Sequence, residues 1–148
     1  MRIIEAIHRS GVGIAPERTI REAAAIMSSA GVGSLAIVDH DRLVGIVTDR
    51  DLVRRGLARG LESDARVDAT MTTPVVTIEA DADLHDAFGL FRSHAVRRLA
   101  VVRGEHFVGM LAIDDLLVYL ASDLADLARP VTAEILFSHR DSPVPATM

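Results

Sequence analysis

The stretch GIVTDRD, residues 45–51, combines a hydroxyl and a carboxylate at a spacing that suits recognition of a phosphorylated nucleoside. Thr48 is expected at the end of a strand, and Asp51 in the first turn of the helix that follows. A helix N-terminus presents free amides and the positive end of the helix dipole to phosphate. A carboxylate one turn on can accept hydrogen bonds from a ribose diol. The same spacing is that of a capping box, which is common and needs no ligand, so the local sequence leaves both interpretations open.

Arg97 and Arg98, in the stretch HAVRRLAVV, are the second candidate for binding an anion. A guanidinium group matches phosphate oxygens two at a time, so two adjacent arginines suit a phosphate group. The alternative is a pair of solvated charges in front of a strand, which is the usual environment of arginine.

The sequence contains no pattern typical of catalysis or of a metal site. The chain has no cysteine, which excludes a thiolate zinc site. None of the six histidines has a second histidine four residues away, and no Ser-His-Asp arrangement is suggested. Residues 31–36 fit G-x-G-x-x-A, but they follow an expected helix and open a strand, which reverses the order of a dinucleotide-binding motif. We therefore predict that the chain is not an enzyme and has no metal site.

A repeat organises the chain, because a constant shift of 64 residues (109 − 45) aligns its two halves without a gap. Asp51 aligns with Asp115, whereas Thr48 aligns with Ala112. An aspartate needed only for capping would lose much of its purpose beside an alanine, so its recurrence favours a role common to two binding sites. Other aligned pairs include Gly45 with Gly109, Val38 with Val102, and Leu35–Ala36 with Leu99–Ala100.

Each half predicts the element order β-α-β-β-α, which makes the chain an α+β protein. Thr19 and Glu22 have capping-box spacing at the start of the first helix, and Asp83 is the expected cap of its counterpart. The expected strands are 12–15, 34–39, 42–48, 75–78, 98–103 and 106–112, and the expected helical stretches are 19–31, 49–60, 81–95 and 114–128.

Two units of about 60 residues are each marginal alone, so we expect them to pack as one body with pseudo-twofold symmetry. The predicted domains are 1–62 and 63–124, followed by a C-terminal tail, 125–148. From Pro130 the tail is expected to be extended or frayed.

Composition limits the partners. The net charge of −5 and an aromatic content of 3 % argue against general binding of nucleic acid. The sequence has no stretch of about 18 apolar residues that could span a membrane, and a cytoplasmic protein is expected.

The continuous apolar run Leu116–Leu120 is wider than one amphipathic stripe. It predicts a symmetric homodimer packed through these closing helices, with coverage by the tail as the alternative.

The tandem repeat with GIVTDRD in its third strand resembles a pair of cystathionine-β-synthase (CBS) domains, or Bateman module. The opening of the second repeat, MTTPVVTIEADADLHDAFGLFRSHAVRRLAVV, is similar to that of the family as well. The resemblance covers about residues 1–124. It implies two β-α-β-β-α repeats packed around a pseudo-twofold axis, with one ligand cleft on each side.

In the family, each cleft takes a hydroxyl and a ribose-binding aspartate from one repeat and packs the base against the other repeat. The resemblance therefore implies a first cleft formed by Ile46, Thr48, Asp51, Val75, Val76, Val96, Arg97 and Arg98. It implies a second, weaker cleft formed by Gly11, Val12, Val32, Gly33, Ser34, Met110 and Asp115, with Ala112 in place of the hydroxyl.

The resemblance implies a regulatory sensor of AMP, ADP or ATP, with or without Mg²⁺, that needs no other cofactor and acts on a separate protein. A dimerisation or interaction module with inert pockets stays open, because Ala112 and Gly33 show that one cleft has already lost polar groups. Another adenosyl ligand, such as S-adenosylmethionine or NAD, also stays open, because Asp51 would still hold its ribose. One dominant nucleotide per chain is expected, because both arginines and the hydroxyl belong to the first cleft.

Overall fold

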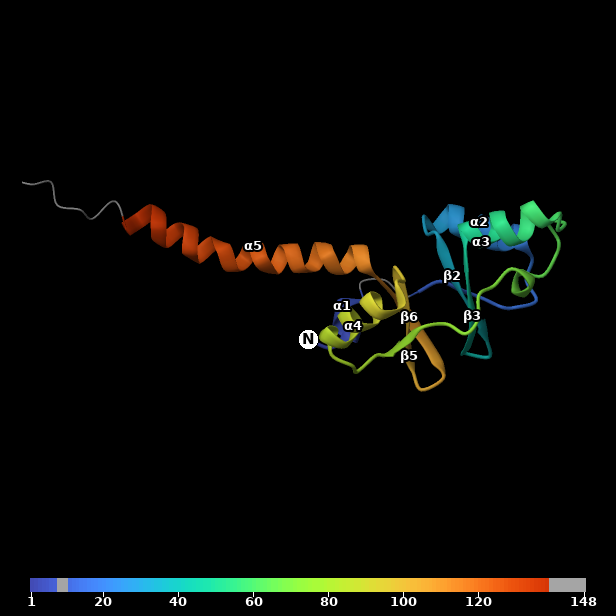
Figure 1. Ribbon diagram of the computed structural model, residues 1–148, viewed down its shortest axis with the longest axis horizontal. Helices are drawn as coiled ribbons and strands as arrows, with labels where there is room; N and C mark the ends of the chain where they lie inside the picture. Colours follow the sequence, from blue (N-terminus) through green and yellow to red (C-terminus); the bar gives the residue numbers. More distant parts are fainter. Residues whose placement is uncertain (8–10, 139–148) are drawn as a thin grey trace, which may run out of the picture. The chain divides into compact units, whose positions relative to one another are not determined.

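The computed structural model describes residues 1–7 and 11–138, with side chains as far as residue 135. The chain divides into two units, Met1–Ile113 and Asp114–Met148. The first unit contains both hairpins and all the strands, shown in Figure 1.

A six-stranded mixed sheet forms the first unit, in the order β1-β2-β3-β6-β5-β4. Each half contributes an antiparallel hairpin and one short parallel strand beside it. This confirms the predicted α+β class. The strands are β1 (Gly13–Ile14), β2 (Ser34–Asp39), β3 (Arg42–Thr48), β4 (Thr77–Glu79), β5 (Arg98–Arg103) and β6 (His106–Ala112).

The helices begin where the capping residues predict. The Thr19 hydroxyl accepts the Glu22 amide at 3.1 Å, and the Glu22 carboxylate accepts the Thr19 amide at 3.1 Å. Asp83 accepts the His85 amide at 2.9 Å. The helices of the first unit are α1 (Ile3–Ala6), α2 (Ile20–Ala30), α3 (Asp49–Asp51), its continuation as η1 (Leu52–Gly56) and η2 (Leu57–Arg59), η3 (Val67–Ala69) and α4 (Leu84–His94).

The hairpin turns lie where the sequence predicts. His40 and Asp41 both have positive φ, 48° and 66°, as a two-residue turn between twisted strands requires. In the second hairpin, Gly104 adopts φ 60°. Gly60 ends the first closing helix with φ 74°.

Hydrogen bonds between the two halves obey the 64-residue shift, which establishes the pseudo-twofold relation. β3 meets β6 at Arg42 and His106. The Leu43 amide donates to the Glu105 carbonyl at 3.2 Å, and its image, the Phe107 amide, donates to the Asp41 carbonyl at 2.9 Å. The predicted pairing of the halves into one body is therefore correct.

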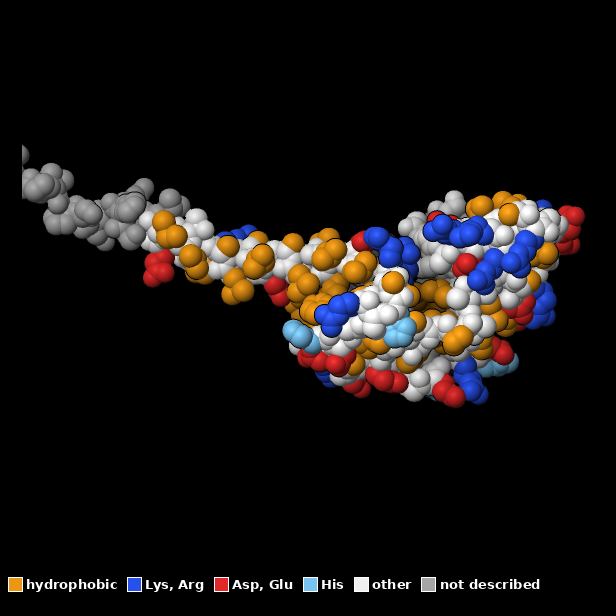
Figure 2. Space-filling model, viewed as in Figure 1, with side chains coloured by type: hydrophobic (Ala, Val, Ile, Leu, Met, Phe, Trp, Pro, Cys, Tyr) orange, Lys and Arg blue, Asp and Glu red, His pale blue; other side chains and the backbone are white. Residues whose placement is uncertain are grey.

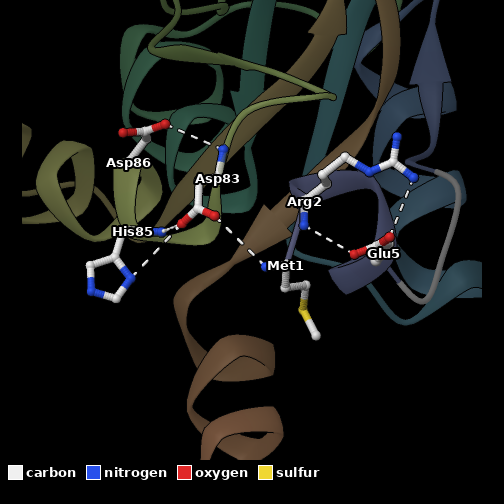
Figure 3. Close-up of polar contacts among 6 residues, drawn as sticks. All are labelled: Met1, Arg2, Glu5, Asp83, His85 and Asp86. Atoms are coloured by element: carbon white, nitrogen blue, oxygen red, sulfur yellow. Dashed lines mark hydrogen bonds and ion pairs between the residues drawn. The ribbon is translucent and has the colours of Figure 1, made fainter.

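The segment that leads into each repeat packs on the other repeat. The Ile3 amide donates to the Ala82 carbonyl at 2.9 Å, and its image Val67 donates to the Arg18 carbonyl at 2.7 Å. Both side chains are fully buried. Figure 3 shows the first of these crossings, where Met1 and Arg2 lie beside the capped start of α4 at Asp83.

These crossings explain why a glycine recurs in the third strand of each repeat. A Cβ on Gly45 would lie 2.5 Å from the Sδ of Met71, and a Cβ on Gly109 would lie 3.3 Å from the Cγ2 of Ile7. Met71 and Ile7 are themselves related by the repeat. Each glycine thus lets the leading segment of the other repeat pass close over the strand.

The second unit is described by helix α5, which begins at Ile113 and runs to Ser138. The expectation of an extended tail from Pro130 is wrong as far as Ser138, because Pro130 lies inside the helix. One proline removes a single backbone donor, whereas the apolar residues continue at helical spacing through Val131 and Ile135. The rest of the predicted tail, with Pro143 and Pro145, lies outside the described residues. Among residues 1–7 and 11–138, no helix is long and apolar enough to cross a membrane.

Candidate functional site

A cavity of about 330 Å³ opens between the two repeats at the end of β3. The structure brings to it all eight residues predicted for the first cleft, and two further residues, Thr72 and Pro74. The lining residues are Ile46, Thr48, Asp51, Thr72, Pro74, Val75, Val76, Val96, Arg97 and Arg98.

Thr48 and Asp51 form a capping box at the start of α3. The Asp51 amide donates to the Thr48 hydroxyl, and the Thr48 amide donates to Asp51 Oδ2, each at 3.0 Å. The other carboxylate oxygen, Oδ1, lies 3.9 Å from Nε of Arg55. The hydroxyl hydrogen of Thr48 is not used by the capping bonds. The capping interpretation is therefore correct, and it leaves Thr48 a donor and Asp51 an acceptor for a ligand.

Backbone hydrogen bonds fix the start of α3 and its counterpart against the opposite strands. The Asp49 amide donates to the Gly33 carbonyl at 3.0 Å, and the Ile113 amide donates to the Arg97 carbonyl at 2.9 Å. These bonds hold Thr48 and the arginine pair at fixed places in the backbone.

Arg97 and Arg98 bring two positive charges to the cavity that Thr48 also lines. Arg98 opens β5, and Val96 and Arg97 precede it. Both arginine side chains are exposed to solvent. One Nη of Arg98 lies 3.8 Å from the position of a Cβ on Gly33, which places this guanidinium near the junction of the repeats.

The apolar wall comes from the segment that leads into β4. Thr72 and Ile46 exchange backbone hydrogen bonds of 3.1 and 2.8 Å, so this segment lies directly against β3. Val75 and Val76 belong to this segment, because β4 begins two residues later than predicted, at Thr77. Thr72 and Pro74 were missed by the sequence analysis. Their place in MTTPVV, directly before two predicted residues, was the available signal.

The predicted second cleft has a different structure. Gly11 packs so closely on β6 that its Cβ would lie 3.0 Å from the Met110 nitrogen and 2.5 Å from Cζ of Phe107. Ser34 is buried at the start of β2, and Gly33 precedes it. The Val12 carbonyl accepts a hydrogen bond from the Ala36 amide at 3.1 Å, and the Val32 amide donates to the Met27 carbonyl at 3.1 Å. Asp115 is an exposed residue in the first turn of α5.

Within the described part of the chain, no cluster of three or more His, Asp or Glu side chains could hold a metal ion. His94, the histidine nearest in sequence to the arginine pair, is exposed, and its Nδ1 lies 3.0 Å from the Ser93 hydroxyl.

Comparisons with known proteins agree with this architecture. The family described as CBS domain matches the chain twice, at residues 4–58 and 65–122. The CBS domain-containing protein YhcV of Bacillus subtilis is 36 % identical over 105 residues, which cover 71 % of this chain and 75 % of YhcV.

Two solved structures share the fold. The CBS domain protein PAE2072 from Pyrobaculum aerophilum, complexed with AMP, matches with a TM-score of 0.71 and 28 % identity, over 82 % of this chain and 99 % of that one. The crystal structure of Hypoxic Response Protein I with two coordinated zinc ions matches with a TM-score of 0.71 and 29 % identity, over 79 % and 97 %. With both repeats matched and their pseudo-twofold packing observed, the chain belongs to the CBS-domain proteins, as a tandem pair.

Proposed function

We propose that the first cleft binds an adenine nucleotide and that the CBS pair acts as a regulatory sensor of it. The single observation that carries the proposal is the cavity itself, which joins a hydroxyl, a carboxylate, two arginines and an apolar wall. The AMP complex of PAE2072, a protein of the same fold, supports this choice of ligand.

Each part of a nucleotide has a chemical counterpart in the lining. Val75, Val76 and Ile46 offer apolar contact to a flat base. Asp51 accepts hydrogen bonds from the ribose diol, and its charge strengthens them. Thr48 and the two arginines bind the phosphate.

We expect one nucleotide per chain. Arg97 and Arg98 have Gly33 and Ser34 as their images, and Thr48 has Ala112. Each hydrogen bond to a charged group contributes roughly 1.5–3 kcal/mol, so two of them separate the affinities of the clefts by a factor of about 100 or more. The close packing of Gly11 on β6 further favours an empty second cleft.

The regulatory output passes to a separate protein in the cytoplasm, and a homodimer through the closing helices is the expected assembly. Because the arginines already supply positive charge, we expect AMP to bind without Mg²⁺ and ATP to bind with or without it.

The test is calorimetric titration with AMP and with adenosine, on the wild type and on two variants. Asp51→Asn keeps an oxygen for the Thr48 amide but removes the charge, so binding of both ligands weakens by at least tenfold. Arg97→Gln/Arg98→Gln weakens AMP by at least tenfold and leaves adenosine within a factor of three. The difference between the ligands assigns ribose and phosphate separately.

Asp115→Asn is the matched control, because Asp115 is the image of Asp51. It leaves AMP binding unchanged at about one site per chain. Loss of AMP binding in Asp115→Asn alone would move the ligand to the second cleft. If the protein does not bind AMP at 1 mM but binds S-adenosylmethionine or NAD, the ligand of the first cleft belongs to a different class of adenosyl compound. If the protein binds none of these three ligands, an inert interaction module is favoured.

A further inference from the structure

Helix α5 exposes a row of large apolar side chains along its length. Seven of them have exposed fractions between 37 and 71 %. Figure 2 shows hydrophobic side chains following one another along this helix. The seven residues are Leu117, Val118, Leu120, Leu124, Leu127, Val131 and Ile135.

Six of these residues follow the spacing of a coiled-coil seam. From Leu117 the next apolar residues come after 3, 4, 3, 4 and 4 positions, ending at Ile135. Alternation of three and four places side chains on one face of a helix, which packs against a second helix by inserting knobs into holes. We call this face the α5 seam; it consists of Leu117, Leu120, Leu124, Leu127, Val131 and Ile135.

Charged side chains leave the α5 seam clear. Asp126 and Arg129 pair with each other at 3.7 Å, on the side of the helix away from the seam. The seam from Leu117 to Val131 is wholly aliphatic, so it needs no opposite charge from its occupant. A face of this kind is complementary to itself across a twofold axis.

The area of apolar surface that α5 exposes also favours an interface between two copies. At roughly 100 Å² of apolar surface per fully exposed side chain, the seven residues expose roughly 400 Å² per helix. Patches of about 300–600 Å² on a soluble protein commonly mark interaction sites. The six seam residues, without Val118, would bury roughly 700 Å² between two helices before flanking residues are counted, against a lower limit of about 1,000 Å² for a biological interface.

Pro130 adds an independent argument for a packed helix. A proline inside a helix removes a backbone hydrogen bond and crowds the preceding turn. Most helical stability in proteins comes from packing of an apolar face rather than from intrinsic propensity. A helix that runs eight residues past a proline, to Ser138, therefore needs a partner for its apolar face.

We propose that α5 pairs through the α5 seam with α5 of a second copy of this chain, as a two-stranded coiled coil. The seam extends from Leu117 to Ile135, whereas the second CBS match ends at residue 122. Leu124, Leu127, Val131 and Ile135 thus form an interface outside the CBS domains. The pairing is independent of the nucleotide proposed for the first cleft.

Sedimentation velocity of the full chain between about 1 and 100 µM tests the pairing. The wild type sediments as a dimer of twice the 15.9 kDa chain. Leu124→Glu places a charge in the seam and raises the dimer dissociation constant at least a hundredfold. Ser122→Glu adds the same charge two residues away on the opposite face and sediments as the wild type does.

A gentler variant covers the case in which Leu124→Glu fails to fold. Leu124→Ala/Leu127→Ala keeps strong helix formers and removes only the seam side chains. It retains the helical circular dichroism of the wild type and raises the dissociation constant at least tenfold. A monomeric wild type at 100 µM would overturn the proposal, and so would a dimer that Leu124→Glu and the alanine variant leave intact. A wild-type monomer that binds an amphipathic peptide with an aliphatic face would overturn the pairing and assign the seam to another partner.

Discussion

Substitution of Gly45 by alanine tests the role of the crossing segments. The Cβ would meet three atoms of Met71, at 2.5, 3.1 and 3.3 Å, so Met71 must move as a whole. The equivalent change at Gly109 meets only contacts of 3.3 Å or more, to Ile7 and to the Gly11 nitrogen. The two glycines occupy the same place in the repeat, which makes each the internal reference for the other.

The expected magnitudes follow from two opposing terms. Alanine in a strand is favoured over glycine by about 0.5–1 kcal/mol, because glycine loses more backbone freedom on folding. Overpacking costs about 1–3 kcal/mol. Gly45→Ala therefore lowers the free energy of unfolding by about 0.5–2 kcal/mol, whereas Gly109→Ala changes it by less than about 0.5 kcal/mol, since its contacts are close to ordinary van der Waals distances.

Urea unfolding followed by circular dichroism measures both changes, read from the midpoint at constant slope. Met71→Ala removes the obstructing side chain, so Gly45→Ala in that background should cost nothing or stabilise the protein. The double-mutant cycle isolates this coupling. Equal effects at Gly45 and Gly109, or a cost at Gly45 that persists beside Ala at position 71, would refute the crossing-segment explanation.

Two further predictions concern the capping groups. Asp51→Ala removes the bond to the Thr48 amide and should cost about 1 kcal/mol more in urea unfolding than Asp115→Ala, which has no threonine before it. Hydrogen bonds from Arg18 and the Thr19 amide hold the pKa of Glu22 below its usual 4.5, and the His85 amide lowers the pKa of Asp83 below 3.8. Because both folded pKa values are depressed, the stability they provide is complete above about pH 4.5 and is lost as pH falls below it, so the urea midpoint should drop in acid, and less steeply in Glu22→Gln.

Much of the fold was predictable because local signals and the repeat agree. The capping box at Thr19, the cap at Asp83 and the turn at His40–Asp41 each depend on residues within three or four positions of one another. Because the two halves repeat, the element order predicted for each half could be combined into one prediction for the whole fold. Pairing of the halves followed from the need of each small unit to bury its apolar face.

The features that were missed depend on contacts distant in sequence. Val67 lies in the core of the first repeat with Ile14 and Leu35, although it follows the predicted end of that repeat at residue 62. Thr72 reaches the cavity only because its segment pairs with Ile46. Neither contact has a local signal. The length of α5 was missed for a different reason, since Pro130 was taken to end a helix that the apolar spacing continues.

The candidate cleft shows the same division between local and distant information. Thr48 and Asp51 were recognisable from their spacing, and the structure shows that this spacing already has a structural purpose as a capping box. The arginines were recognisable as charges, and only the fold brings them to the same cavity as Thr48. The sequence thus identified the residue types, and the pseudo-twofold packing supplied their arrangement.

The repeat also separates residues required by the fold from residues available to a ligand. A leading segment crosses the same strand position in both halves, since Met71 lies over Gly45 and Ile7 over Gly109. Nothing in the backbone requires a hydroxyl in both halves, since α5 begins after Ala112 without one. A residue that breaks the symmetry while its neighbours keep it is therefore free of the symmetric constraint. Thr48 and the arginine pair break it on the same side of the axis, around the same cavity, which is the pattern expected when one of two equivalent clefts is specialised for a ligand.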